Sequence, residues 1–170
     1  DVKEKQEYSQ ITTANFQVSD DYVLFQAENQ LKTWSSAVIN AGSGWYRNFV
    51  NRRVDAKYHC DNVQEEMIEY LTTQGLSEAD TVGMMTAVKT TDAVIKEYDT
   101  PLGNIVVMVT AGVGNAVDVS KAHEVEMFPS VGTINTWIVI NGELAEEAFI
   151  QSVITATEAK TKAMAHEQVM

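Results

Sequence analysis

The sequence predicts an α+β fold, in which a largely antiparallel or mixed β-sheet forms the core and helices cover it, including a long C-terminal helix. Three observations support this prediction. The first forty residues are rich in β-prone segments, residues 93–110 have the pattern of a hairpin, and residues 143–166 have the pattern of a helix. Strands and helices do not alternate regularly, which favours α+β over a doubly wound sheet.

Two strands are predicted near the N-terminus. Residues 22–27 are apolar and β-prone and follow an Asp-Asp turn, and a second strand is expected over 31–39. Residues 40–44 contain two glycines, which predict a flexible loop because glycine adopts positive φ without strain.

Two helices are predicted in the middle of the chain. Asp61 is a suitable N-cap for a helix over 62–74, and Gly75 is a natural residue to end it. Its apolar face repeats at i, i+4 and i+8 and consists of Val63, Met67 and Leu71. Ser77 and Asp80 resemble a capping box, so a short second helix is expected to about Met85.

The following segments predict strands again. Residues 87–89 and 93–98 alternate in polarity, 104–110 are strongly apolar, and the turn between them contains Pro101 and Gly103. Residues 93–110 therefore predict a β-hairpin. Another buried strand is expected over 133–141, where Asn-Gly ends it.

The long C-terminal helix has a stripe of small residues at i, i+3 and i+4 spacing. We expect the helix to pack closely on the sheet through this stripe, which consists of Ala145, Ala148, Ser152, Ala156, Ala159 and Ala163.

Composition and charge exclude several classes of protein. With 170 residues, 45% hydrophobic and 21% charged, the chain is predicted to form one globular domain over 1–170 rather than a disordered chain. The net charge of −12 argues against nucleic acid or an anionic membrane as partner, because both are negatively charged. One Cys and the lack of a long apolar run predict a cytoplasmic protein; a homo-oligomer is left open.

Common catalytic and metal motifs are absent from the sequence, and its three histidines show no ligand spacing, so no metal site is expected. Three segments of small polar residues stand at predicted strand ends or in loops: 35–40, 110–115 and 132–135. Their hydroxyls and amides can serve in amide hydrolysis, which needs a nucleophile or activated water and donors for the oxyanion. From composition alone, hydrogen bonding within turns and caps is the more common role of such residues, and their spacing does not show that the three segments converge.

At these segments the sequence resembles the adenosylcobinamide amidohydrolase family of corrinoid salvage. The matching pieces keep the order of the family between residues 34 and 164. They are Ser35-Ser-Ala37 leading to Asn40-Ala-Gly42, Asn51-Arg-Arg-Val54, Leu76 to Met85, Thr110 to Ala116, Gly132-Thr-Ile-Asn135, and Glu158-Ala-Lys160. The chain departs from the family pattern at Ala41, where a second glycine is expected, and at Gly114, which is often serine.

The resemblance implies hydrolysis of the amide that joins the aminopropanol arm to the corrin ring of adenosylcobinamide, giving adenosylcobyric acid. It implies a small-molecule corrinoid as partner and no resident cofactor, since cobalt enters only within the substrate. The alternative is a non-catalytic corrinoid-binding or regulatory protein of the same fold.

Roles within this reaction are assigned on physical grounds. Glu158 is the candidate general base for water, Asn135 a donor to the oxyanion, and Ser36 the alternative nucleophile. Glu158 also forms an i, i+4 pair with Lys162, which is equally typical of a surface position. The candidate substrate-binding residues are Asn40, Asn51, Thr110, Asn115, Thr133 and Lys160. We expect Ser36, Thr110, Asn115, Thr133, Asn135 and Glu158 to line one pocket.

Overall fold

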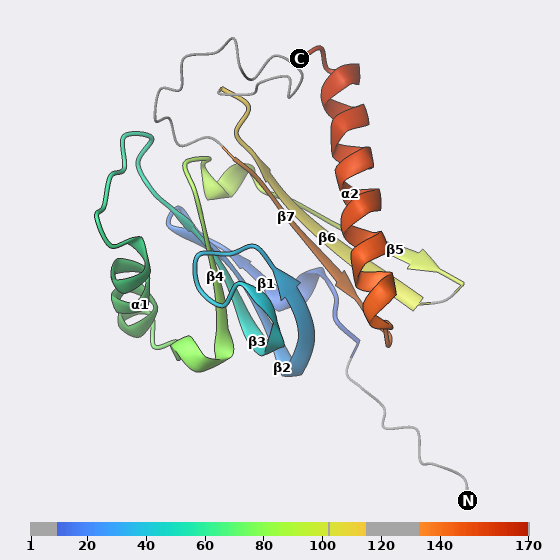
Figure 1. The fold of residues 1–170 in the computed structure, drawn as a ribbon, viewed down its shortest axis with the longest axis horizontal. Helices are drawn as coiled ribbons and strands as arrows, with labels where there is room; N and C mark the ends of the chain where they lie inside the picture. The colour runs from blue at the N-terminus through green and yellow to red at the C-terminus, as the bar shows by residue number, and fades with distance from the viewer. Residues whose placement is uncertain (1–9, 102, 115–132, 170) are drawn as a thin grey trace, which may run out of the picture.

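The computed structural model describes residues 10–101, 103–114 and 133–169, which form two β-sheets and two α-helices (Figure 1). Three short 3₁₀ turns connect them, η1 (Thr13–Asn15), η2 (Glu78–Asp80) and η3 (Thr90–Asp92). The strands are β1 (Phe16–Val18), β2 (Tyr22–Ser35), β3 (Gly42–Arg53), β4 (Thr81–Thr86), β5 (Val94–Thr100), β6 (Gly103–Ala111) and β7 (Ile134–Ile140), and the helices are α1 (Val63–Thr73) and α2 (Glu146–His166).

The first sheet is mixed and the second is antiparallel. In the order β1-β2-β3-β4, the first three strands are antiparallel neighbours, whereas β3 and β4 run parallel. The second sheet has the order β5-β6-β7 with antiparallel pairs throughout. The predicted α+β class with a mixed and antiparallel core is therefore confirmed.

The two sheets pack against each other through alternate residues of their strands, as a half-buried strand requires. Phe25 and Phe49 from the first sheet contact a cluster that includes Trp137 and Met108 from the second. Full burial of one such side chain contributes about 1.5–3 kcal/mol, so this interface is a main source of stability. Three polar residues share the interface and are described with the candidate site.

Helix α1 covers the opposite face of the first sheet. Met67 and Leu71 are fully buried there against Leu24, Ile39 and Val50. The helix ends as predicted: Gly75 has a φ of 72°, and the amides of Gly75 and Leu76 donate to the carbonyls of Thr72 and Leu71.

The N-terminus of α1 differs slightly from the prediction. The N-cap is Asn62 rather than Asp61, and its side chain accepts a hydrogen bond from the amide of Glu65. Both residue types cap well, so the sequence does not distinguish the two positions.

Four predictions for residues 22–89 are wrong. Residues 22–35 form one strand, β2, instead of two, and β3 begins at Gly42 within the predicted loop. Residues 77–85 form η2 and strand β4 rather than a helix, because Asp80 bonds outward to β2 and β3 instead of capping. Residues 87–89 do not form a strand. By contrast, the predicted hairpin is confirmed as β5 and β6, and the predicted last strand as β7.

Helix α2 exists as predicted, but it begins at Glu146 and does not pack through its small-residue stripe. None of its side chains, all of which the structure describes, is buried, and Ala159 and Ala163 are exposed to solvent. The helix runs alongside β7 (Figure 1). Within the described residues, neither α-helix is long and apolar enough to cross a membrane.

Candidate functional site

An open cleft of about 1290 Å³ lies between α2 and the strands β2 and β7. The cleft exists because α2 does not bury its side chains against the sheet. The side of α2 that faces the sheet lines the cleft instead. Known small-molecule sites measure about 300–1,000 Å³, so this cleft is larger than most of them. Among the predicted site residues, four line it: Ser36, Thr133, Asn135 and Lys160.

A chain of buried polar side chains lies behind one wall of this cleft. Asn51 of β3 donates from Nδ2 to Oγ1 of Thr110 on β6 at 2.9 Å. Asn135 of β7 donates from Nδ2 to Oδ1 of Asn51 at 2.7 Å and to the carbonyl of Met85 at 2.8 Å. Thr133 donates from Oγ1 to Oδ1 of Asn135 at 3.3 Å, which completes what we call the polar network (Asn51, Thr110, Thr133 and Asn135).

The polar network connects both sheets and is inaccessible apart from its end at the cleft. Asn51 and Thr110 are fully buried, Asn135 is 5% exposed, and Thr133 is half-buried. Buried amides of this kind are tolerated because their hydrogen bonds are made internally. Four of the residues singled out from sequence, three on strands and Thr133 just before β7, are thus brought together.

The hydrogen bonds fix the orientation of the Asn135 side chain. Both amide protons on Nδ2 are already donated, one to Asn51 and one to the Met85 carbonyl. The amide therefore has no proton left for an oxyanion in this arrangement. Its Oδ1 instead accepts from Thr133, and no donor to the Thr133 hydroxyl oxygen is found among residues 10–101, 103–114 and 133–169.

The two candidate residues of α2 lie on different sides of the helix. Lys160 lines the cleft, whereas Glu158 is exposed and is not among the lining residues. Two residues apart on a helix are separated by ~200°, so both cannot face the same space. Ser36 follows the end of β2 at the cleft and is exposed there.

The side chain of Asn40 makes hydrogen bonds to the backbone rather than facing the cleft. Its φ of 59° places it in the left-handed region, where asparagine is tolerated. Its Nδ2 donates to the carbonyls of Glu78 at 2.7 Å and Thr81 at 2.8 Å, which ties the turn before β3 to the start of β4. Asn115, also predicted for the site, lies outside the described residues.

Aromatic residues that the sequence analysis did not single out form another wall of the cleft. Trp34 of β2 and Phe149 of α2 stack with ring centroids 6.3 Å apart, and Trp45 of β3 stands nearby on the same sheet face as Trp34. We call these three residues the aromatic wall. The sequence does contain one signal that could have identified the two tryptophans, because Trp34 and Trp45 flank the polar segment 35–44.

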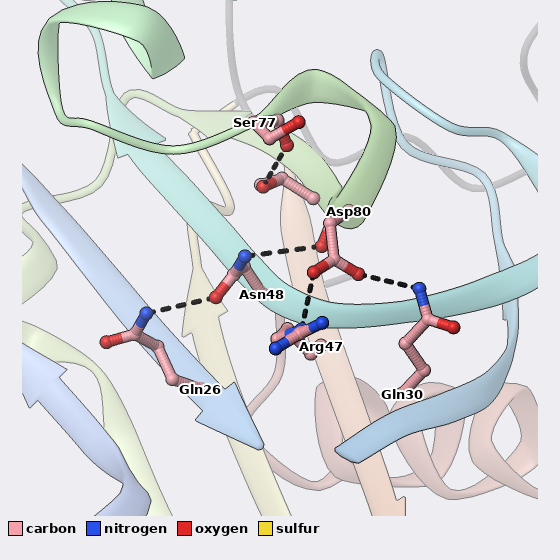
Figure 2. Close-up of polar contacts among 7 residues, drawn as sticks. Gln26, Gln30, Arg47, Asn48, Ser77 and Asp80 are labelled. Atoms are coloured by element: carbon pink, nitrogen blue, oxygen red, sulfur yellow. Dashed lines mark hydrogen bonds and ion pairs between the residues drawn. The ribbon is translucent and has the colours of Figure 1, made fainter. Parts of the chain in front are cut away.

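Polar contacts join β2 and β3 to the start of β4 on the sheet that carries Trp34 and Trp45 (Figure 2). Between the pairs Gln26–Asn48 and Leu31–Tyr46, β2 has residues 27–30 where β3 has only Arg47, so β2 bulges. Asp80 binds Nε of Arg47 at 2.5 Å and Nε2 of Gln30 at 3.0 Å. Both bonds are made within the bulge, by Gln30 of β2 and by Arg47 of β3 opposite it.

The largest electrostatic effects among the described residues lie away from the cleft, between β3 and α1. Arg52 binds both carboxylate oxygens of Glu66, at 2.6 and 2.7 Å, and Tyr58 donates to the same carboxylate at 2.7 Å. The Arg52 hydrogen bonds lower the pKa of Glu66, and burial followed by the bond to Glu66 raises the pKa of Tyr58. This cluster joins α1 to the sheet.

Metal ligands are not grouped within the part of the chain that the structure describes: it holds no cluster of three or more His, Cys, Asp or Glu side chains suited to a metal ion. The absence of a resident cofactor stays a prediction.

The fold and cleft define a protein suited to a large ligand that has both polar and apolar surfaces. The chain belongs to the adenosylcobinamide amidohydrolase family, CbiZ, whose sequence profile matches residues 5–170. The resemblance seen in the sequence is therefore confirmed over nearly the whole chain.

A curated relative from Bacillus subtilis (strain 168), described as the uncharacterized ABC transporter ATP-binding protein YvrA, is 24% identical over 151 residues. The match covers 89% of this chain, and the chain spans 29% of the length of that relative. No solved structure matches the chain.

Proposed function

We propose that this protein hydrolyses the amide bond between the aminopropanol arm and the corrin ring of adenosylcobinamide, and that the corrinoid binds in the cleft beside α2. The products are adenosylcobyric acid and aminopropanol. One observation carries the location of the site: the polar network, built from residues far apart in sequence, ends at the wall of this cleft.

The dimensions and lining of the cleft support this ligand. A corrin ring with its peripheral amides is larger than most small-molecule ligands, and the cleft exceeds the usual volume of their sites. The ring also presents apolar surface and neutral amides, which match an aromatic wall on one side and amide and hydroxyl groups on the other. The acidic net charge does not oppose a corrinoid that is neutral or cationic.

Within this proposal Thr133 accepts a hydrogen bond from an amide N–H of the corrinoid. Its own proton is directed to Oδ1 of Asn135, which leaves its oxygen free to accept. Asn135 cannot take up a proton, so it does not activate Thr133 as a nucleophile. We therefore assign the attack to a water molecule, with Ser36 at the cleft as the alternative nucleophile, and treat Asn135 as the residue that positions Thr133.

The reaction is tested by incubating the purified chain with adenosylcobinamide in the dark, in water enriched in ¹⁸O, and analysing products by mass spectrometry. Hydrolysis gives adenosylcobyric acid with one ¹⁸O in its new carboxylate, together with aminopropanol. Transfer of the acyl group to an amine would leave the label out.

The role of Thr133 is tested with Thr133→Val, which keeps the shape of the side chain and removes the hydroxyl. Loss of one hydrogen bond predicts that KM rises about tenfold while kcat changes little. Thr133→Ser should retain most of the affinity. Thr91→Val is the matched control, since Thr91 is exposed and outside the cleft. A kcat that collapses in Thr133→Val with KM unchanged would contradict the binding role.

The second candidate function is corrinoid binding without turnover. One observation favours it: the described residues that line the cleft include neither histidine nor cysteine, and the candidate base Glu158 is not among them. Equilibrium dialysis separates the two functions. Retained binding of adenosylcobinamide without any adenosylcobyric acid would support the binding protein.

A further inference from the structure

Two of the three tryptophans are unusually exposed, and both are in the cleft. Trp45 is 59% exposed and Trp34 is 41% exposed, whereas Trp137 is 8% exposed and donates from Nε1 to Sδ of Met84 at 3.0 Å. Large aromatic side chains left in contact with water, next to one another and in a cleft, mark binding surfaces more often than isolated exposed residues do.

The register of β2 and β3 places these side chains together. Lys32 is paired with Trp45, and Trp34 lies two residues further along β2, so Lys32, Trp34 and Trp45 share one face of the sheet. Helix α2 reaches this face through its first turns. Phe149 stacks on Trp34 at an interplanar angle of 19°, and Nζ of Lys32 lies 3.3 Å from Oε1 of Glu146.

A corrinoid offers one flat group that suits such a surface. The cobalt carries axial ligands above and below the corrin ring, so a side chain cannot lie flat over the centre of the macrocycle. The adenine of an adenosyl ligand, by contrast, has an open π-face, and bases stack readily on tryptophan.

We propose that Trp34 and Trp45 bind the adenine of the upper axial ligand and thereby select adenosylated corrinoids. This inference rests on the proposed function, since it takes the cleft as the corrinoid site. The aromatic wall then recognises the axial ligand, while the polar network recognises amides of the ring. The two recognition elements are separate sets of residues, so each can be altered without the other.

The test compares two ligands that differ only in the upper axial group. Adenosylcobyric acid and methylcobyric acid keep the corrin ring but lack the arm that is hydrolysed, so binding is measured without turnover. Dissociation constants are obtained by equilibrium dialysis of the full chain in the dark, for the parent, Trp34→Leu and Trp45→Leu. Tyr98→Leu is the matched control, because Tyr98 is an exposed aromatic residue of a strand outside the cleft.

Each tryptophan variant is expected to weaken binding of the adenosyl form about tenfold and binding of the methyl form less than about twofold. Trp34→Tyr should restore most of the affinity, because tyrosine also stacks, and Tyr98→Leu should change neither constant.

Equal weakening of both ligands, or no weakening of either, overturns the inference and leaves the proposed function intact. A parent protein that binds both ligands equally well, or binds neither, also overturns it. The turnover assay with adenosylcobinamide then decides the proposed function separately.

Discussion

The two helices of this protein contrast in how they meet the sheets. Helix α1 has 11 residues and buries Met67 and Leu71 completely, whereas α2 has 21 residues and buries none of its side chains. Helix length is therefore no measure of its contribution to the core. The shorter helix stabilises the fold, and the longer one forms a wall of the cleft.

The sheet beneath α1 explains its close approach. Gly83 of β4 faces the helix, and a Cβ at this position would lie 2.9 Å from Cε of Met67 and 3.2 Å from Cβ of Ile39. The missing side chain makes room for Met67. Helix α2 instead contacts β2 near its N-terminal end, where Phe149 stacks on Trp34 and Glu146 pairs with Lys32.

The two helices should differ most in how much stability is lost when an apolar side chain is truncated, because only α1 has buried side chains. Leu71→Ala should lower the free energy of unfolding by about 2–5 kcal/mol, because it removes buried apolar surface and leaves a cavity. Ile154→Ala in α2, where the side chain is 45% exposed, should change it by no more than about 0.5 kcal/mol. Urea unfolding of both variants measures the two values. Similar losses would show that α2 belongs to the core in solution.

A smaller, pH-dependent effect is expected from the contact that joins α1 to β3. The Arg52 hydrogen bonds lower the pKa of Glu66 below its ordinary 4.5, so the ionised form stabilises the folded state above that pH. Because Glu66 is partly exposed, Glu66→Gln should cost about 1 kcal/mol at pH 7.

This cost should shrink as the pH falls from 4.5 through the folded pKa of Glu66, because the parent protein then loses the same contact. Urea unfolding at several pH values measures the change. Glu69→Gln, an exposed position on the same helix, is the control. A cost that is constant between pH 7 and pH 3 would contradict the assignment.

The smallest effect on stability is expected in α2 itself. Ala156 is half-buried and lines the cleft, so Ala156→Leu should change the free energy of unfolding by less than about 0.5 kcal/mol. The added side chain should instead occupy part of the cleft and weaken corrinoid binding several-fold. Thermal unfolding and equilibrium dialysis measure the two quantities. A large loss of stability would show that α2 closes tightly on the sheet.

Local signals in the sequence predicted the hairpin, β7 and the C-terminal end of α1, because turn chemistry and strong alternation act between near neighbours. Strand β4 was predicted as a helix because Ser77 and Asp80 have capping-box spacing. Its actual partner is β3, which pairs in parallel from more than twenty residues away, and such pairing leaves no local signal. The stripe of alanines in α2 likewise does not reveal whether a sheet lies close to it.

The candidate site was predictable where polar residues end buried strands. Thr110, Thr133 and Asn135 were expected to converge for that reason. In the structure Asn51 links Thr110 to Asn135, and Thr133 bonds directly to Asn135. The direction of their hydrogen bonds was not predictable, because it depends on the Met85 carbonyl of another sheet. The aromatic wall was missed because tryptophan in a strand usually indicates core, and exposure is not visible in sequence.

The polar network also has a consequence for how the protein folds. Its bonds join Asn51 to residues 59 and 84 positions away, so the site comes into existence only after both sheets have formed and docked. A ligand held by these side chains binds only the native state, and at a hundred times its Kd it would add about 2.7 kcal/mol to global stability. The free energy of unfolding would thus rise with the concentration of the ligand.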